Sequence, residues 1–426
     1  MKEYAGAGKR SEWRENLVIA ALVVLALFLA ARTGFLQNTL PRLNQEQTLE
    51  NGLTVGADIS LFGEEPVRIM LQTADGRYGV EYDQETVKRL YDDGLSHLLE
   101  QSLRGMETPA VIPEVEWQKM LLEEECWIFY DFLNNLSFSD QDRNGAARYF
   151  VIFSDGTKAQ TIAYYNQEQR TFYAGSINEE LLLPPTVHVV TPNGGGFAFE
   201  DPATAQQLFP YMMVMQEPPV CPVYLAGNPL KKLDSSGWTA FLGALDFNAN
   251  AVSPYTTASG NVIREGADTL RIMNDGTIQF HSLENGELRY QALSSQPGDL
   301  KRKSGEILEN LMKLLPTDAV CSCQSVRETE SGQTELLYSY VLNGARVNLW
   351  GDGWGARFLY KGNALISYTI LLRSYEPSQL RQPLLPTRQA AAAASAMGRR
   401  GAELQVLYRD SGNDQVNAGW AVQEPR

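Results

Sequence analysis

Cysteine and histidine are both scarce in this chain of 426 residues, which contains four cysteines and three histidines. A secreted domain held together by disulfides needs a far higher density of cysteine. The closest two, Cys321 and Cys323, are spaced more tightly than a redox Cys-x-x-Cys pair, and no two histidines have the His-Glu-x-x-His spacing of a zinc site. We therefore expect ordinary hydrophobic cores to hold the fold, and no cofactor.

Catalytic signatures are missing as well. The chain has no Gly-x-Ser-x-Gly elbow and no phosphate-binding P-loop. Carboxylates are abundant, so a pair of them brought together by folding, as in a glycosidase, stays open as an alternative. The formal net charge of −15 repels nucleic acid, and we expect no nucleic-acid partner. These features favour a protein that is not an enzyme.

One long apolar run interrupts the otherwise polar start of the chain, from Leu17 to Ala31. Basic residues precede it and Arg32 follows it, and with the next few residues it approaches the roughly 20 that a helix needs to cross a bilayer. We expect a transmembrane anchor over 17–36 after a cytoplasmic tail over 1–16, with the remainder outside the cell. A cleaved signal peptide is one alternative, although its small-residue cleavage site is poor, and a buried helix is another.

Small residues recur along this run, including Ala20, Ala26 and Ala30. Because Ala26 and Ala30 are four residues apart, they lie on one side of a helix and would let a second membrane helix approach closely. The equally weighted alternative is that alanine is simply an apolar filler of the span.

The rest of the chain indicates an α+β fold, with helices packed on antiparallel sheets in two extracytoplasmic domains. We expect a stalk over 37–65, an N-terminal domain over 66–225 and a C-terminal domain over 235–426, separated by a proline-rich stretch. Hydrophobic periodicity and turn signals predict helices over 83–105, 113–124, 203–215, 238–245, 305–315 and 387–396. They predict strands over 67–71, 126–132, 148–154, 159–165, 171–174, 187–190, 269–273, 277–283, 287–292, 335–342, 345–350, 356–360, 364–373, 404–408 and 419–422.

A polar segment in the first domain has the beginning of a calcium loop. Asp140, Asp142 and Asn144 occupy the first, third and fifth positions, and Gly145 follows. Position twelve should be an acidic ligand and is Val151 instead. The sequence thus leaves two interpretations: a weak calcium site, or a polar hairpin turn between two strands.

Aromatic residues cluster in the second domain, at Trp350, Trp354, Phe358, Tyr360 and Tyr368. They could stack on a glycan, but at this spacing they are more typical of the inner face of a sheet.

Several segments together resemble the YycH/YycI family of extracytoplasmic regulators of Gram-positive bacteria. The order of basic N-terminus, single anchor and external α+β domains matches, and 269–278, 338–347, 363–368 and the closing strands look like that family's sheet segments. In the family the final Trp usually follows Pro-Ala, whereas Ala418 and Gly419 precede Trp420 here. The likeness is strongest over 235–426; it does not distinguish YycH from YycI, although the length favours the former.

The resemblance implies a single-pass protein of the cell membrane that binds a two-component sensor histidine kinase in the same membrane and thereby tunes cell-wall metabolism. A paralogous regulator would be a second partner, and the bilayer is contacted through 17–36. Two other functions stay open: a tethered protein that binds envelope glycan or peptide, and an anchored hydrolase.

Overall fold

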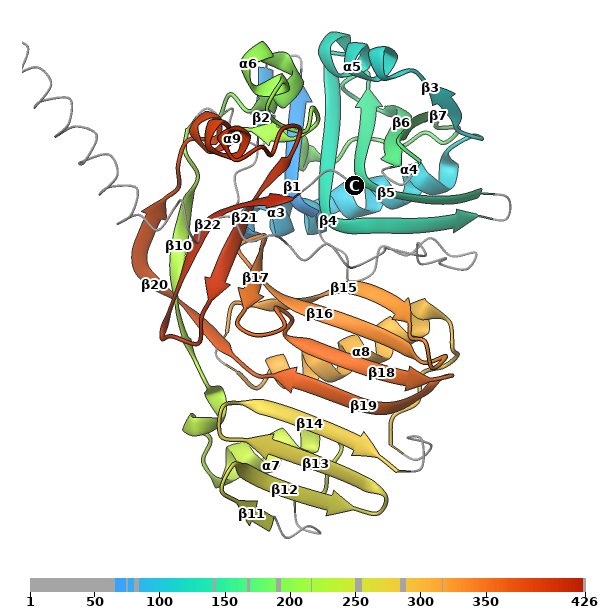
Figure 1. Cartoon of the computed structure of the whole chain (residues 1–426). Helices are drawn as coiled ribbons and strands as arrows, with labels where there is room; N and C mark the ends of the chain where they lie inside the picture. Colours follow the sequence, from blue (N-terminus) through green and yellow to red (C-terminus); the bar gives the residue numbers. More distant parts are fainter. Residues whose placement is uncertain are drawn as a thin grey trace, which may run out of the picture.

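The computed structural model describes residues 66–73, 76–79, 84–140, 143–166, 169–188, 193–215, 217–249, 255–283, 289–315 and 317–423. These residues form an α+β structure of two large, mostly antiparallel sheets, one above the other in Figure 1. This confirms the predicted α+β class and its antiparallel sheets. Within these ranges no helix is both long and apolar enough to span a bilayer. The run Leu17–Ala31, with Ala20, Ala26 and Ala30, lies outside them.

The first sheet has seven strands in the order β2-β1-β4-β5-β6-β7-β3, all paired antiparallel. Its strands are β1 (Pro66–Thr73), β2 (Gly76–Gly79), β3 (Ala110–Ile112), β4 (Cys126–Asp140), β5 (Arg143–Ser154), β6 (Ala159–Asn166) and β7 (Thr171–Ser176). Helices α3 (Gln84–Leu90) and α4 (Ser96–Gly105) cover one face, and α5 (Glu114–Glu123) covers the other.

Alternation along β4 explains why both faces need a cover. Ile128 and Tyr130 belong to the core with α3 and α4, whereas Trp127 and Phe129 belong to the core with α5. Successive side chains of a strand point to opposite faces, so an uninterrupted apolar run such as this one buries both faces of the sheet.

The predicted helix over 83–105 is interrupted by a π-helical turn, Tyr91–Leu95, between α3 and α4. Gly94 has a positive φ of 122° there, and a Cβ on it would lie 2.9 Å from the Cβ of Pro184. Glycine is needed both for the backbone angle and for this close approach. The apolar positions at three- and four-residue intervals are buried as expected, from Val87 to Leu103.

Two predictions for the end of the first region are wrong. Pro185–His188 is a short 3-10 helix rather than the start of a strand over 187–190. Instead of a helix over 203–215, only Pro202–Ala205 is helical (α6), and Met213–Val214 (β9) pairs with Gly196–Phe197 (β8). Pro210 accounts for the second error, because proline lacks an amide donor and disfavours helical geometry in the residue before it.

The second sheet has thirteen strands. They are β10 (Val220–Gly227), β11 (Tyr255–Thr257), β12 (Gly260–Glu265), β13 (Asp268–Met273), β14 (Thr277–Ser282), β15 (Val320–Glu328), β16 (Thr334–Leu342), β17 (Ala345–Leu349), β18 (Ala356–Lys361), β19 (Ala364–Leu371), β20 (Ser374–Pro383), β21 (Glu403–Asp410) and β22 (Gln415–Gln423). Helices α7 (Ser235–Ala244) and α8 (Pro297–Met312) lie side by side against one part, and α9 (Thr387–Ala396) packs on β21 and β22.

The hairpins around glycine turns are confirmed, from β13–β14 to β18–β19. The strand predicted over 287–292 is wrong: of its described residues 289–292, only Gln291 forms a bridge, with Ala364. The place beside β14 is taken by β19, whose Tyr368 lies opposite Phe280. β10 pairs with β20 and β22 in this sheet, and the division into 66–225 and 235–426 stays a prediction.

Four buried charges join the two sheets. Arg68 and Arg148 both bind Asp131, through contacts of 2.5 and 2.8 Å, and Arg148 makes a two-pronged contact with Glu403 of β21 at 2.6 and 2.8 Å. All four side chains are at most 6% exposed. A charge buried this deeply is tolerated only when it is paired, so the charged residues of the first sheet depend on Glu403 of the second.

Candidate functional site

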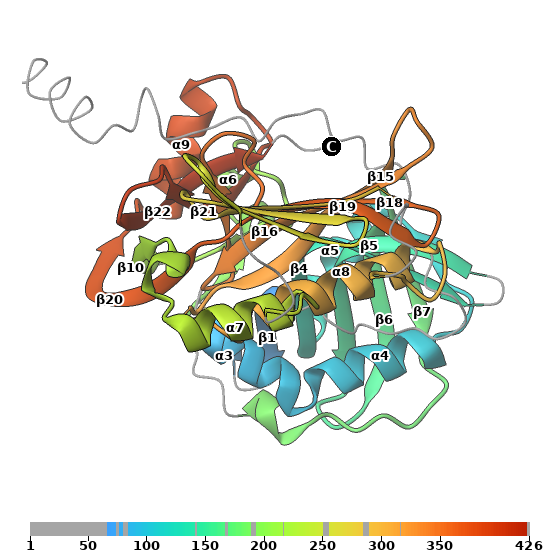
Figure 2. The ribbon, with the colours of Figure 1, turned by 90° about the horizontal axis from the view of Figure 1, so that it is seen from below.

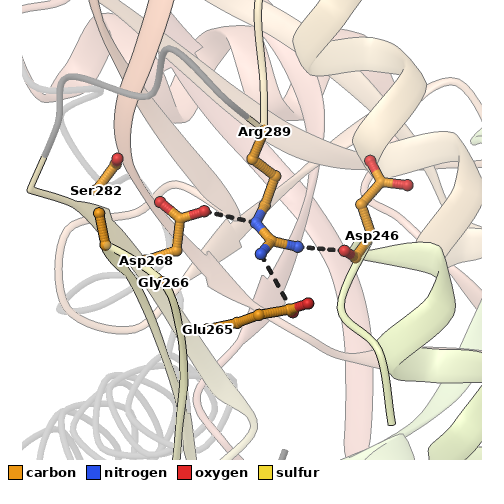
Figure 3. Close-up of a pocket in the computed structure, with 7 residues that line it drawn as sticks. Asp246, Glu265, Gly266, Asp268, Ser282 and Arg289 are labelled. Atoms are coloured by element: carbon orange, nitrogen blue, oxygen red, sulfur yellow. Dashed lines mark hydrogen bonds and ion pairs between the residues drawn. The ribbon is translucent and has the colours of Figure 1, made fainter. Parts of the chain in front are cut away.

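One pocket of about 330 Å³ opens at the tip of the second sheet, where the β12–β13 turn approaches the end of α7 (Figure 3). None of its lining residues was a site candidate from the sequence, although Ser282 and Arg289 lie in the strands predicted over 277–283 and 287–292. The lining residues are Asp246, Glu265, Gly266, Ala267, Asp268, Ser282 and Arg289. Gly266 has a φ of +61° in the turn, a conformation that glycine adopts without strain. The Glu-Gly-Ala-Asp turn was the available sequence signal for this hairpin.

Arg289 is the centre of the pocket. Its guanidinium binds Asp268 at 2.6 Å and Glu265 at 3.1 Å, and it donates to the backbone carbonyl of Asp246. The guanidinium carbon also lies 3.9 Å from the centre of the Phe247 ring. Burial works against the charge on Arg289, but Asp268 and then Glu265 outweigh it, so the pKa of Arg289 is raised and the group stays charged.

These contacts decide what the pocket can attract. The guanidinium already faces two carboxylates, which makes it a poor receptor for an anion. Figure 3 shows the Asp246 carboxylate turned away from it. Three carboxylates against one arginine leave an excess of negative charge, which favours an ammonium or guanidinium group of a ligand over a phosphate.

The predicted calcium residues lie at the turn between β4 and β5. Asp140 is paired with Arg143, and Ser139 with Asn144, so the segment forms the hairpin that was the alternative interpretation. Asp142 lies outside the described residues, as do the side chains of Asp140 and Asn144. Elsewhere in the described part of the chain, no three acidic, cysteine or histidine side chains are grouped to hold a metal ion.

The aromatic cluster is divided by the structure. Phe358, Tyr360 and Tyr368 are buried in the core with α7 and α8, which confirms the interpretation as an inner sheet face. Trp350 is 39% exposed, and the guanidinium of Arg373 lies 5.0 Å from the centre of its ring.

Cys321 and Cys323 are free thiols on β15. Burial raises the pKa of Cys321 to about 12, which keeps this thiol protonated and poorly nucleophilic at neutral pH. Asn134 of β4 donates a 2.7 Å hydrogen bond to the carbonyl of Cys323, so this segment also contacts the first sheet.

Exposed apolar residues gather at the β3 edge of the first sheet and on the neighbouring helix. We call Val111, Val115 and Leu122 the β3–α5 surface; they are 65%, 77% and 51% exposed. Of the α5 side chains only Trp117 and Leu121 are fully buried, so the apolar Val115 faces outward. Large exposed apolar residues at a free strand edge are typical of a contact surface for another protein.

Comparison with protein-family models, curated proteins and solved structures finds no match to this chain.

Proposed function

We propose that this protein is a membrane-anchored, non-enzymatic regulator that binds the extracytoplasmic part of a two-component sensor histidine kinase, as its resemblance to the YycH/YycI family suggests. The anchor over 17–36 would hold the chain beside the kinase, with the external domains outside the cell. The apolar run Leu17–Ala31 and the order of segments after it support this arrangement.

The β3–α5 surface is the observation that carries the proposal. Among the described residues, β3 is the last strand of its sheet and pairs only with β7, which leaves one side of its backbone without a strand partner from this part of the chain. Proteins recognise extended partner segments by adding them to such an edge, and nearby apolar side chains supply affinity. The external domain of the kinase is the partner that we assign to this edge.

Co-purification from native membranes tests the proposal. The tagged full-length protein is compared with a version whose Leu17–Ala31 run is replaced by an unrelated anchor, with Ala26→Leu and Ala30→Leu variants, and with a Val111→Glu/Val115→Glu variant. The two added glutamates on the β3–α5 surface should abolish recovery of the kinase, because burying two carboxylates without partners in the contact is costly. Leu283→Glu/Leu293→Glu, which adds two charges at apolar residues that are 75% and 80% exposed, is the matched control.

The pattern of recovery separates the contacts. If only the Val111→Glu/Val115→Glu variant fails to recover the kinase, the contact lies outside the membrane. If the anchor replacement fails to recover it, the contact lies within the bilayer. Recovery of no kinase with any version would overturn the proposal and favour the envelope-binding alternative.

A further inference from the structure

The surface formed by β20 and α9, at one end of the second sheet, differs in charge from the rest of this acidic chain. From Pro377 to Ala402 the sequence has four arginines and no aspartate or glutamate, although the whole chain carries a net charge of −15. These residues form most of β20 and all of α9. With β10, they lie along one side of the molecule in both views (Figures 1 and 2).

Exposed apolar residues share this side with the arginines. Residues directly opposite in an antiparallel pair lie on the same face, and Pro222 is opposite Arg381 while Val220 is opposite Pro383. We define the basic arm as the exposed residues Val220, Leu225, Leu380, Arg381, Arg388 and Arg400. Leu380 and Arg381 are successive residues of β20 and point to opposite faces, so the arm presents its apolar and basic groups from both faces of this strand. Two acidic residues near these elements form ion pairs, Glu376 with Lys232 and Asp201 with Arg388, and exposed Asp414 accepts a backbone hydrogen bond from Ala226 of β10. The positive charge of the arm therefore rests mainly on Arg381 and Arg400.

The backbone of β20 argues against another strand as the occupant. β20 is the last strand of its branch, but Pro377 and Pro383 have no amide hydrogen to donate. The pairing register with β10 also shifts between Pro222 and Tyr224, which disrupts the edge. Prolines and bulges are the devices by which proteins block strand addition at an edge.

We propose that the basic arm rests on the anionic headgroup surface of the membrane, an inference that rests on the membrane anchor of the proposed function. Arginines and exposed aliphatic side chains together suit this interface, since the cations attract anionic lipid and the apolar groups enter the headgroup boundary. The arm would thus orient the external domains, while the β3–α5 surface on the opposite side stays available to the kinase.

Lipid quenching tests this contact on the full-length protein, reconstituted in vesicles of phosphatidylcholine with or without phosphatidylglycerol. A fluorophore is placed on Leu380→Cys, and on Leu182→Cys as a control, since these positions are similarly exposed at 60% and 64%. When phosphatidylglycerol is present, spin-labelled lipids should quench the label on Leu380→Cys but not the label on Leu182→Cys. Without phosphatidylglycerol neither label should be quenched, and added salt should reverse the quenching. The unsubstituted protein corrects for labelling of native cysteines.

Charge variants complete the test. Arg381→Gln/Arg400→Gln should lower the occupancy of the bilayer-contacting state about 30-fold, whereas Arg264→Gln/Arg271→Gln, equal in charge but on β12 and β13, should not. Equal quenching in both lipid compositions, or none at Leu380→Cys, would overturn the inference. Flotation of the same vesicles measures membrane attachment through the anchor separately. A protein that floats with the vesicles but shows no quenching contradicts the contact of the basic arm and leaves the proposed function intact. A protein that does not float with the vesicles refutes the anchor.

Discussion

The junction cluster of Arg68, Asp131, Arg148 and Glu403 and the pocket around Arg289 use the same chemistry in two surroundings. In each, an arginine lies between two carboxylates. At the junction every member is at most 6% exposed, whereas Glu265 in the pocket is 30% exposed. Water can replace a lost partner of Glu265, although Asp268 is only 9% exposed, but it cannot do so at the junction. Burial, rather than the number of ion pairs, therefore determines which arginine the fold depends on.

Replacing Arg148 should have the largest effect on stability and is the strongest test of the difference between the junction cluster and the pocket. Arg148→Ala leaves Asp131 and Glu403 buried with fewer partners, and we expect a loss of about 3–5 kcal/mol in the free energy of unfolding. Urea denaturation of the full-length protein in detergent, followed by tryptophan fluorescence, measures it. Arg148→Met/Glu403→Met removes the charges together and should recover much of the loss. A cost below about 1 kcal/mol for the single variant would contradict the assigned role.

Acid should weaken the junction through Glu403. Burial opposes the charged form of Glu403, but Arg148 and then Arg68 outweigh it, so its pKa lies below the ordinary value of 4.5. A group with a lowered pKa in the folded state contributes stability above its unfolded pKa and loses it as the pH falls through its folded pKa. The stability difference between wild type and Glu403→Gln should be constant above pH 4.5 and shrink below it. A difference that grows on acidification would refute this sign.

Arg289 should matter less. Arg289→Gln keeps the side chain's polarity but removes its ion pairs. We expect a cost of about 1–2 kcal/mol, because Asp268 is buried but Glu265 is 30% exposed and can be solvated by water. The same urea titration measures it, and Arg271→Gln on β13 controls for the loss of one positive charge. If Arg289→Gln cost as much as Arg148→Ala, burial would not be the feature that distinguishes the two clusters.

The sequence predicted local features better than these clusters. Turn signals predicted the β13–β14 hairpin, because turn residues such as Asn274 and Gly276 act on their own neighbours. β15 and β20 were missed, since their sequences alternate weakly or contain prolines and their structure depends on distant partners. Arg148 and Glu403 are 255 positions apart, and no local pattern connects them. The pocket was missed for the same reason, because Arg289 reaches it from a segment distant from Glu265.

An ion pair on the surface should give the smallest stability cost among the pairs compared. Lys88 and Asp92 lie four residues apart, with 3.1 Å between Nζ and the carboxylate, and their side chains are 49% and 56% exposed. Because water solvates both groups, Lys88→Ala should change the free energy of unfolding by about 0.5 kcal/mol or less, and added salt should reduce even that. Lys119→Ala, which breaks the exposed pair with Glu123 on α5, should behave alike. A cost near that of Arg289→Gln would show that exposure does not rank these pairs.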